Sequence, residues 1–265
     1  MIYSHSGDLG DMIYGLSLAK YTGCDKFIVF DYNNGPQRSR INKTTYAAIE
    51  PLLLSQKYIN KPLYCHRQYI TPMVGFRHWL KWFSIPESHF FAYQHSKEVA
   101  LEFISGNVWL DNIPVQKVKR VIVNKGPRYW HNGLNICDFL KNFDSSDVGF
   151  IGDESEYHEF SQQCNIKYSY IRTPTLLHVA SVIAGSELFV GNGSCCAAIS
   201  QAMRHPAVIF IHPNNKRSIN FNLESTHLIE NGLGNLFNLY LFLSKHNINL
   251  DFSKFDFLSN SILLK

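Results

Sequence analysis

Residues 1–20 read MIYSHSGDLGDMIYGLSLAK and place a short apolar strand, a polar glycine-bearing turn and a helix in direct succession. The turn spans residues 4–10. After it, Ile13, Leu16 and Ala19 recur at helical spacing, which gives the helix one apolar face. A strand, a glycine turn and a helix form the opening unit of a doubly wound α/β domain. Such domains bind ligands at the carboxyl edge of the sheet, where this turn is expected to lie.

The turn contains two carboxylates, Asp8 and Asp11, beside Gly7 and Gly10. One aspartate could cap the helix, because Asp accepts hydrogen bonds from the first helical N–H groups and suits the helix dipole. Capping needs only one Asp and gives no reason for two glycines, which permit close backbone approach. We therefore interpret the turn as a catalytic or binding segment, with capping alone as the alternative.

The composition is that of a globular protein. The 265 residues are 45% hydrophobic and 17% charged, enough for one large core or two small ones. A net charge of +4 suits a phosphate-bearing ligand and does not by itself indicate nucleic acid binding. No apolar run approaches the roughly 18 residues of a membrane helix. No signal peptide pattern opens the sequence, so we expect a cytoplasmic protein with six reduced, mostly buried cysteines.

Two basic segments of the first half are candidates for binding an acceptor. Arg38 and Arg40 lie in QRSRINK, which is either a solvated loop or a basic arm facing the aspartate turn. Arg77 and His78 lie in an aromatic segment, residues 66–110. Aromatic and His side chains hold sugars by stacking and hydrogen bonds, and they equally pack a helix on its own sheet. No histidine has a metal-site spacing, so no metal site is expected.

The periodicity predicts alternating strands and helices in two halves. In the first half we expect strands at 26–30 and 58–65, and a Thr-capped helix at 44–56 that Pro51 bends or breaks. The composition shifts near Pro114, so we place a domain boundary at about residue 115. The second half is expected to contain strands at 118–124, 148–152, 167–171 and 188–190 and helices at 136–143, 153–164, 173–185 (capped by Thr173), 236–245 and 252–264.

A second glycine turn lies in residues 188–203, LFVGNGSCCAAISQAM. Backbone N–H groups at a helix start, with glycines that admit a ligand, form a phosphate cradle, and Ser194 can add a hydroxyl. Lys125 and Arg128 follow the strand at 118–124 and would supply positive charge for a leaving diphosphate. The alternatives are a turn that serves packing only and a loop with ordinary surface charges.

Both glycine turns resemble segments of the lipopolysaccharide heptosyltransferases, glycosyltransferase family 9 of the GT-B superfamily. SGDLGDMIYGL is similar to the N-terminal motif of that family, and FVGNGSCCAAISQAM to its signature FVGNDSGPAHLAAAL. The resemblance, as a short divergent member, implies an α/β fold of two doubly wound Rossmann-like halves that face a cleft. Residues 1–115 would form the acceptor side, 116–235 would bind the nucleotide sugar, and the helices of 236–265 would cross back to the first half.

The resemblance also implies roles for single residues. Asp11 falls where the family keeps its catalytic base, and Asp8 would share or orient that role. The remaining assignments are Lys125, Arg128, Asn192, Gly193 and Ser194 for the donor diphosphate, Gly152 and Asp153 for the donor nucleoside, and Arg38, Arg40, Arg77 and His78 for the acceptor. The chain departs from the signature, because Gly193 replaces its Asp, Cys195–Cys196 its Gly–Pro and Ala198 its His. The resemblance therefore does not name the sugar.

These observations predict a glycosyltransferase that moves a sugar from a nucleotide-diphosphate sugar to an acceptor hydroxyl, with inversion and with no metal or other cofactor. The sequence has no DxD-type motif, which agrees with a reaction that needs no metal. Two alternatives stay open. One is a non-catalytic nucleotide-sugar-binding protein of the same fold. The other is a transferase whose acceptor is a modified DNA base instead of a glycan.

Overall fold

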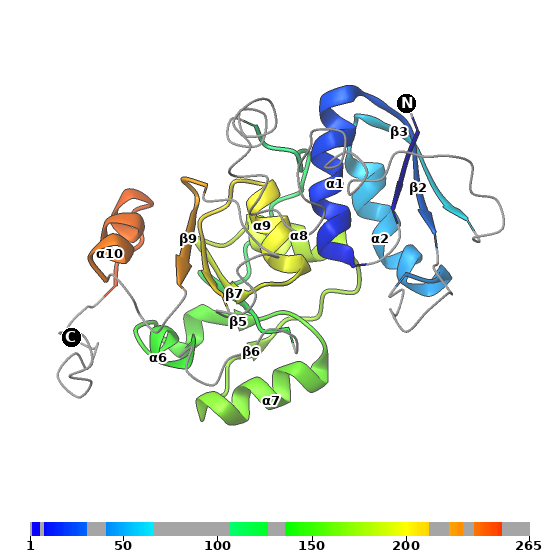
Figure 1. The fold of residues 1–265 in the computed structure, drawn as a ribbon. Helices are drawn as coiled ribbons and strands as arrows, with labels where there is room; N and C mark the ends of the chain where they lie inside the picture. Colours follow the sequence, from blue (N-terminus) through cyan, green and yellow to red (C-terminus); the bar gives the residue numbers. More distant parts are fainter. Residues whose placement is uncertain are drawn as a thin grey trace.

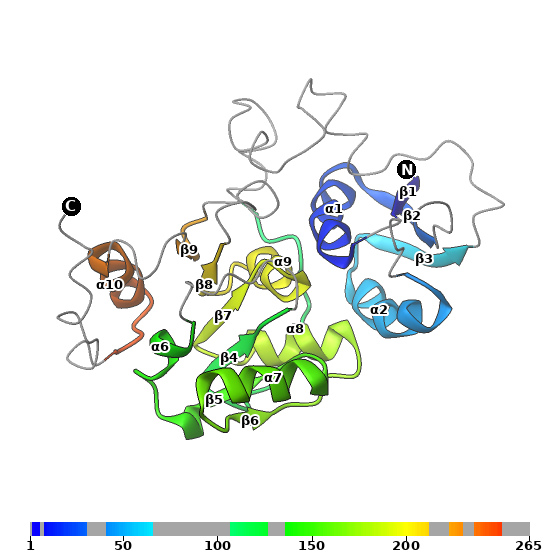
Figure 2. The same ribbon diagram turned by 60° about the horizontal axis from the view of Figure 1, so that its bottom comes forward.

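The structure is a computed structural model, and it describes residues 2–5, 8–30, 41–65, 107–126, 136–211, 223–229 and 236–250. These residues form an α/β fold with two sheets, of order β1-β2-β3 and β6-β5-β4-β7-β8-β9. Every pair of neighbouring strands is parallel. The expected α/β class with parallel sheets is therefore confirmed (Figures 1 and 2).

The helices and strands follow the predicted alternation closely. The first sheet and its helices comprise β1 (Ile2–His5), α1 (Leu9–Thr22), β2 (Cys24–Phe30), α2 (Lys43–Ser55) and β3 (Ile59–Cys65). The second comprises β4 (Val121–Asn124), α6 (Ile136–Leu140), η2 (Ser145–Asp147), β5 (Val148–Phe150), α7 (Glu154–Cys164), β6 (Ser169–Tyr170), α8 (Leu176–Ala184), β7 (Leu188–Asn192), α9 (Cys195–Ala202), β8 (Ala207–Phe210), β9 (Thr226–Ile229) and α10 (Leu236–Lys245).

The strand order of the second sheet determines where a ligand can bind. Counted along this sheet's own strands, the order is 3-2-1-4-5-6, as in dinucleotide-binding folds. The direction of winding reverses between β4 and β7, which pair up to Asn124 and Gly191. Open parallel sheets bind ligands beyond the carboxyl ends of the strands at this reversal. A site is therefore expected just after Asn124 and Asn192.

The alternation of side chains along the strands of the second sheet divides the core into two layers. Ile122, Phe189 and Ile209 face α8 and α9, and they join one apolar cluster with α1 and α2. Their strand neighbours Val123 and Val190 face α6, α7 and α10 in a second cluster. Because successive strand residues point to opposite faces, each fully buried strand supplies both layers.

Helices α8 and α9 lie between the two sheets. α1 packs on α9 and α2 packs on α8, as both views show (Figures 1 and 2). The α1–α9 contact contains a buried hydrogen bond, in which the Tyr14 hydroxyl donates to Gln201 Oε1 at 2.7 Å. The connecting segment is fastened to the first sheet's helices, since Trp109 is fully buried and its indole N–H donates to the Ile13 carbonyl at 3.0 Å. The hydrogen bond of Tyr14 thus holds α1 against the last turn of α9.

The sequence analysis expects the helices of residues 236–265 to cross back to the first half. The last described helix, α10, instead stays on the second sheet. Leu239, Phe242 and Leu243 of α10 belong to the cluster on the outer face of the second sheet. α10 and the pair α1 and α2 lie at opposite ends of the molecule in both views (Figures 1 and 2). The apolar stripe that suggested a crossing helix is buried against its own half instead. Residues 251–265, where a final helix was expected, lie outside the described residues.

Two helix starts and one proline differ from the expectations. Asn42, not Thr44, caps α2, and its side chain accepts from the Thr45 N–H at 2.9 Å. α8 begins after Thr175 instead of Thr173. α2 continues past Pro51, because the fully buried Leu52 and Leu53 bind this turn to the core. Apolar burial on this scale outweighs the lost hydrogen bond.

The expectation of six reduced cysteines is wrong for Cys137 and Cys164. These two form a disulfide between α6 and the last residue of α7, with the Cα atoms 5.0 Å apart. The pairing was not predictable from spacing, because the two cysteines meet only when α6 and α7 pack on the same face of the sheet. Cys24, Cys65, Cys195 and Cys196 are outside this disulfide and stay reduced.

Candidate functional site

A pocket of about 270 Å³ lies at the carboxyl edge of the second sheet, where its winding reverses. The start of α1 closes it from the side of the first sheet. The other walls are the segments that follow β4, β5 and β7. The lining residues are Asp8, Leu9, Gly10, Asn124, Gly126, Gly152, Asp153, Glu156, Gly193, Ser194, Cys195 and Cys196.

Three helix N-termini converge on this pocket, those of α1, α7 and α9. Their unpaired N–H groups and dipoles favour negative charge. α1 and α7 already carry carboxylates at their starts: Asp8 precedes α1, and Glu156 accepts from the Asp153 N–H at 3.1 Å. α9 is different, because its cap is the neutral Ser194, whose side chain accepts from the Ala197 N–H. The start of α9 is therefore the part of the pocket best suited to an anion.

Two asparagines hold the ends of the three central strands together. Asn192 is 1% exposed, and both the oxygen and the nitrogen of its carboxamide form hydrogen bonds with the Gly126 backbone. Its Oδ1 accepts from the Gly126 N–H and its Nδ2 donates to the Gly126 carbonyl, each at 2.9 Å. Asn124 is 4% exposed and donates from Nδ2 to the Ile151 carbonyl at 2.8 Å, which ties β4 to the segment after β5.

The two predicted catalytic carboxylates occupy different places on α1. Asp8 lines the pocket, whereas Asp11 lies in the first turn of the helix and is not among the lining residues. Both side chains are half-buried. Burial raises the pKa of the Tyr14 phenol, and the negative charge of the nearby Asp11 raises it further. The Asp8–Asp11 turn thus reaches the pocket through Asp8.

Gly10, in the first turn of α1, lies where this helix meets the start of α9. A Cβ at Gly10 would lie 3.9 Å from the Ser194 carbonyl oxygen and 3.9 Å from the Cys195 Cα. The backbone of α1 therefore runs directly against the start of α9. A methyl group would be in ordinary contact there, and a longer side chain would have to enter the pocket or separate the two helices.

Of the residues predicted to bind the diphosphate, Gly193 and Ser194 line the pocket and Lys125 does not. The Lys125 ammonium turns onto α7, where it contacts Glu159 Oε1 at 2.8 Å and Gln163 Oε1 at 2.6 Å. Its side chain is only 3% exposed. Lys125 is thus neutralised by a carboxylate of α7 that the strand pattern alone could not place beside it. Asn192 is close by, with its side chain on Gly126.

The predicted nucleoside residues, Gly152 and Asp153, line the pocket beside Asn124. Gly152 has a φ of +143°, and a Cβ there would come within 2.7 Å of Glu156 Oε2 and 3.1 Å of Asn124 Nδ2. The glycine is therefore required by its backbone conformation and by its neighbours. The predicted sites Arg38, Arg40, Arg77, His78 and Arg128 lie outside the described residues.

Sequence reasoning missed Asn124, Gly126 and Glu156 as pocket residues. Asn124 is the last residue of a buried strand, a position where polar side chains of α/β folds meet ligands. Glu156 stands three residues after Asp153 at a helix start, the spacing of a capping pair. Both signals were available in the sequence. Gly126 gave none, because its role depends on Asn192, which lies 66 residues away.

The Cys195 and Cys196 thiols line the pocket at the start of α9. Burial raises the pKa of the Cys196 thiol to about 12, and the nearby Glu156 carboxylate adds to this shift. Burial also raises the pKa of Cys195 well above its usual range. Both thiols are therefore protonated at neutral pH and lack the thiolate that nucleophilic cysteine chemistry needs.

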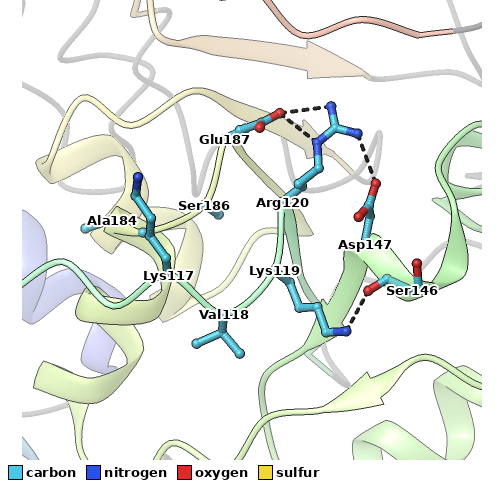
Figure 3. Close-up of a pocket in the computed structure, with 10 residues that line it drawn as sticks. Lys117, Val118, Lys119, Arg120, Ser146, Asp147, Ala184, Ser186 and Glu187 are labelled. Atoms are coloured by element: carbon cyan, nitrogen blue, oxygen red, sulfur yellow. Dashed lines mark hydrogen bonds and ion pairs between the residues drawn. The ribbon is translucent and has the colours of Figure 1, made fainter.

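A second hollow lies at the opposite, amino edge of the same sheet (Figure 3). It is larger, about 490 Å³, and its Arg120 guanidinium pairs with the carboxylates of Asp147 and Glu187. Arg120 lies between Asp147 and Glu187, at 3.0 Å from each, and the Lys119 ammonium donates to the Ser146 carbonyl, as the dashed lines show. This hollow carries no functional assignment.

Two further features concern only the part of the chain that the structure describes. Its helices all lack the combination of length and apolar character that crossing a bilayer requires. Its His, Cys, Asp and Glu side chains form no group of three or more arranged to hold a metal ion.

Compared by sequence, the chain matches no protein-family model and no curated protein. Compared by structure, it is similar to the E. coli heptosyltransferase WaaC, solved with ADP, with a TM-score of 0.59 and 9% identity over 92% of this chain and 99% of that one. It also matches a glycosyl transferase family 9 protein from Veillonella parvula DSM 2008, with a TM-score of 0.49 and 10% identity over 95% of this chain and 90% of that one. The two glycine turns resemble those of the heptosyltransferases, and the similarity to WaaC confirms this resemblance at the level of the fold.

Proposed function

We propose that this chain is a glycosyltransferase that moves a sugar from a nucleotide-diphosphate sugar to an acceptor hydroxyl, in the cleft between two Rossmann-like halves. The observation that carries the proposal is the single pocket that joins the Asp8 turn of the first sheet to the winding reversal of the second. A carboxylate and an anion-favouring helix start meet there, as a transferase of this class needs.

The donor diphosphate would bind at the start of α9. The neutral Ser194 cap, Gly193 and the first N–H groups of α9 offer hydrogen bonds and a favourable dipole without a carboxylate on that helix. Gly152 and Asp153 would contact the nucleoside. The Lys125 ammonium is paired with Glu159, so Arg128, two residues after Gly126 in the sequence, would supply the positive charge for the diphosphate. The WaaC structure of the same fold holds ADP, and a nucleoside diphosphate is the leaving group of such a donor.

The reaction would be a direct displacement. The acceptor oxygen attacks the anomeric carbon while the bond to the diphosphate breaks, which inverts that carbon. Asp11 would take the acceptor proton as general base, and Asp8, which lines the pocket, would orient the acceptor. Positive charge and helix dipoles would stabilise the diphosphate as its charge develops, so the proposal requires no metal.

A thermal-shift panel of nucleoside diphosphates and their sugars tests the proposal. A ligand present at 100 times its Kd stabilises the folded state by about 2.7 kcal/mol. We expect one nucleotide sugar to raise the Tm of the wild type and of Asp11→Asn, and to raise that of Arg128→Ala far less. The proposal fails if no member of the panel raises the wild-type Tm.

A non-catalytic nucleotide-sugar-binding protein is the second candidate. The observation that favours it is the loss of the signature side chains at the start of α9, where Gly193 and Ala198 stand. Such a protein would bind the same donor and release no nucleoside diphosphate from it in the presence of a range of glycan acceptors. Product release measured with the donor identified by the panel separates the two candidates.

A further inference from the structure

We propose that residues 108–111 lock the two halves of the molecule at one separation, so that the pocket is formed before a ligand enters it. Gln56 and Trp109 are the positioning residues of this lock. Neither of them lines the pocket, and both act on it through the placement of α1 against α9. The lock itself does not depend on the proposed function. Its consequence for a nucleotide sugar does.

The carboxamide of Gln56 binds the locking segment to the first half. Gln56 follows α2, and its side chain is fully buried. Its Nε2 donates to the Asp111 carbonyl and its Oε1 accepts from the Asp111 N–H, each at 3.0 Å. The Lys20 ammonium of α1 donates to the Val108 carbonyl at 2.8 Å and pairs with the Asp111 carboxylate. Both ends of the segment are therefore tied to helices of the first half.

Trp109 binds the same segment to both halves at once. Its indole N–H donates to the Ile13 carbonyl of α1 at 3.0 Å, and its own carbonyl accepts from the Tyr58 hydroxyl at 2.6 Å. The backbone N–H groups of Trp109 and Leu110 donate to the Ala202 carbonyl at the end of α9, at 3.0 and 3.2 Å. Carbonyls in the last turn of a helix need partners from outside the helix, and the locking segment supplies one for α9.

The two halves also share one hydrophobic core. α1 and α2 belong to a single apolar cluster with α8 and α9, in which Met12 of α1 and Ala198 of α9 are both fully buried. Domains of one chain are expected to move relative to each other unless their interface is large and hydrophobic. A hinge needs residues whose backbone is able to change conformation, whereas both halves hold the backbone of residues 108–111. A rotation of the halves would break these bonds and expose the shared core.

The lock determines the geometry of the pocket. α1 meets α9 at two places: a Cβ added at Gly10 would lie 3.9 Å from the Cys195 Cα, and the Tyr14 hydroxyl donates to Gln201 Oε1 near the end of α9. Tilting one helix away from the other would break one of these contacts. The distance between Asp8, which precedes α1, and the start of α9 is therefore set in the ligand-free protein. A nucleotide sugar bound there would need no closing rotation of the halves.

Distances between spin labels on the full chain test the lock. One label pair, at Leu54 of α2 and Gln162 of α7, spans the two halves, and the control pair, at Gln162 and Leu241 of α10, lies within the second half. All three side chains are exposed, and labels attached through an unnatural amino acid leave the native thiols unlabelled. Electron–electron resonance should give one distance population between the halves, as narrow as that of the control pair, and ADP should shift neither. A broader or second population between the halves, or a mean that shifts with ADP, would overturn the proposal.

Two variants test the positioning residues by the same distances. Gln56→Ala removes both hydrogen bonds to Asp111 and should broaden the population between the halves while the control pair stays unchanged. Trp109→Phe removes only the indole donor and should broaden it less. Lys57→Ala, at the exposed neighbour of Gln56, is the control variant. Wild-type widths in both Gln56→Ala and Trp109→Phe would contradict the role of these residues.

The outcomes for the lock and for the proposed function are separate. If Gln56→Ala does not fold, Gln56→Glu, which keeps the acceptor and loses the donor, takes its place. If the wild type binds neither ADP nor any other nucleoside diphosphate, the proposed function fails, and the widths measured without ligand decide the lock.

Discussion

The two edges of the second sheet carry hollows of different character. The amino-edge hollow is about 490 Å³ and includes Arg120, whose guanidinium is held by Asp147 and Glu187 (Figure 3). The carboxyl-edge pocket is only about 270 Å³, yet three helix starts open into it. Helix N-termini retain N–H groups that no backbone partner satisfies, whereas a paired guanidinium has little left to offer a ligand. The capacity to bind thus depends on which polar groups remain available, more than on the size of the hollow.

The largest expected effect concerns the carboxyl edge. Asp11→Asn should lower the rate of sugar transfer by about 10²- to 10⁴-fold, because removal of a general base costs about that factor. Its affinity for the nucleoside diphosphate should stay close to that of the wild type. Steady-state kinetics with the donor found in the thermal-shift panel make the measurement. Asp138→Asn, an exposed change on α6, is the control. A rate unchanged by Asp11→Asn would exclude Asp11 as the general base.

The disulfide lies on a face of the sheet between the two edges, so it should affect the stability of the fold and neither hollow. Cys137 and Cys164 are separated by 27 residues, and closing a loop of this size stabilises a protein by about 3.5 kcal/mol in the chain-entropy account. Cys137→Ser should lose about that much free energy of unfolding in urea titrations. A reducing agent should destabilise the wild type similarly and leave the variant unchanged. Equal stability of the wild type with and without reductant would contradict the bridge.

A pH effect should arise at the amino edge. His205 contacts Ser186, which lines the hollow there, through Nε2 and Oγ at 2.9 Å. Burial, with a smaller contribution from His246, lowers the pKa of His205 to about 4. Between about pH 6.5 and 4 the unfolded chain therefore binds a proton that the folded chain does not, so stability falls as the pH falls through this window. The loss is at most about 3.4 kcal/mol, since each unit of pKa difference corresponds to about 1.36 kcal/mol.

This pH dependence is measured by denaturant unfolding at several pH values. His205→Gln should flatten the profile between pH 6.5 and 4. His158→Gln, at a side chain that is 66% exposed, should leave it unchanged. The same slope in His205→Gln and the wild type would assign the effect to another group, such as the half-buried His227, whose pKa burial also lowers.

The smallest effect is expected at the paired charges of the amino edge. The Arg120 side chain is 43% exposed, and exposed ion pairs contribute about 1 kcal/mol or less. Arg120→Ala should change the free energy of unfolding by no more than this and should not change nucleoside diphosphate affinity. A large loss of affinity would place the ligand at the amino edge and contradict its assignment to the carboxyl-edge pocket.

How far the sequence predicts this molecule depends on the range of the interaction. The first glycine turn, the alternation of strands and helices in the second half and the Ser194 turn are local patterns, and each could be read from adjacent residues. The partners of Lys125 and Asn192 could not, because they are set by the packing of α7 and by a pairing across 66 residues. α10 shows the same limit. Its apolar face predicted burial, but not against which half.

The most direct test of the account compares Ser194→Asp with Ser194→Asn. Asp and Asn cap helices about equally well, so the two variants should have similar stability and differ mainly in one negative charge at the start of α9. Calorimetry with the nucleoside diphosphate that stabilises the wild type should show affinity at least about 10-fold weaker for Ser194→Asp than for Ser194→Asn, since the added charge repels a phosphate a few ångströms away. Equal affinities of the two variants would show that the anion does not bind at α9 and would contradict the account.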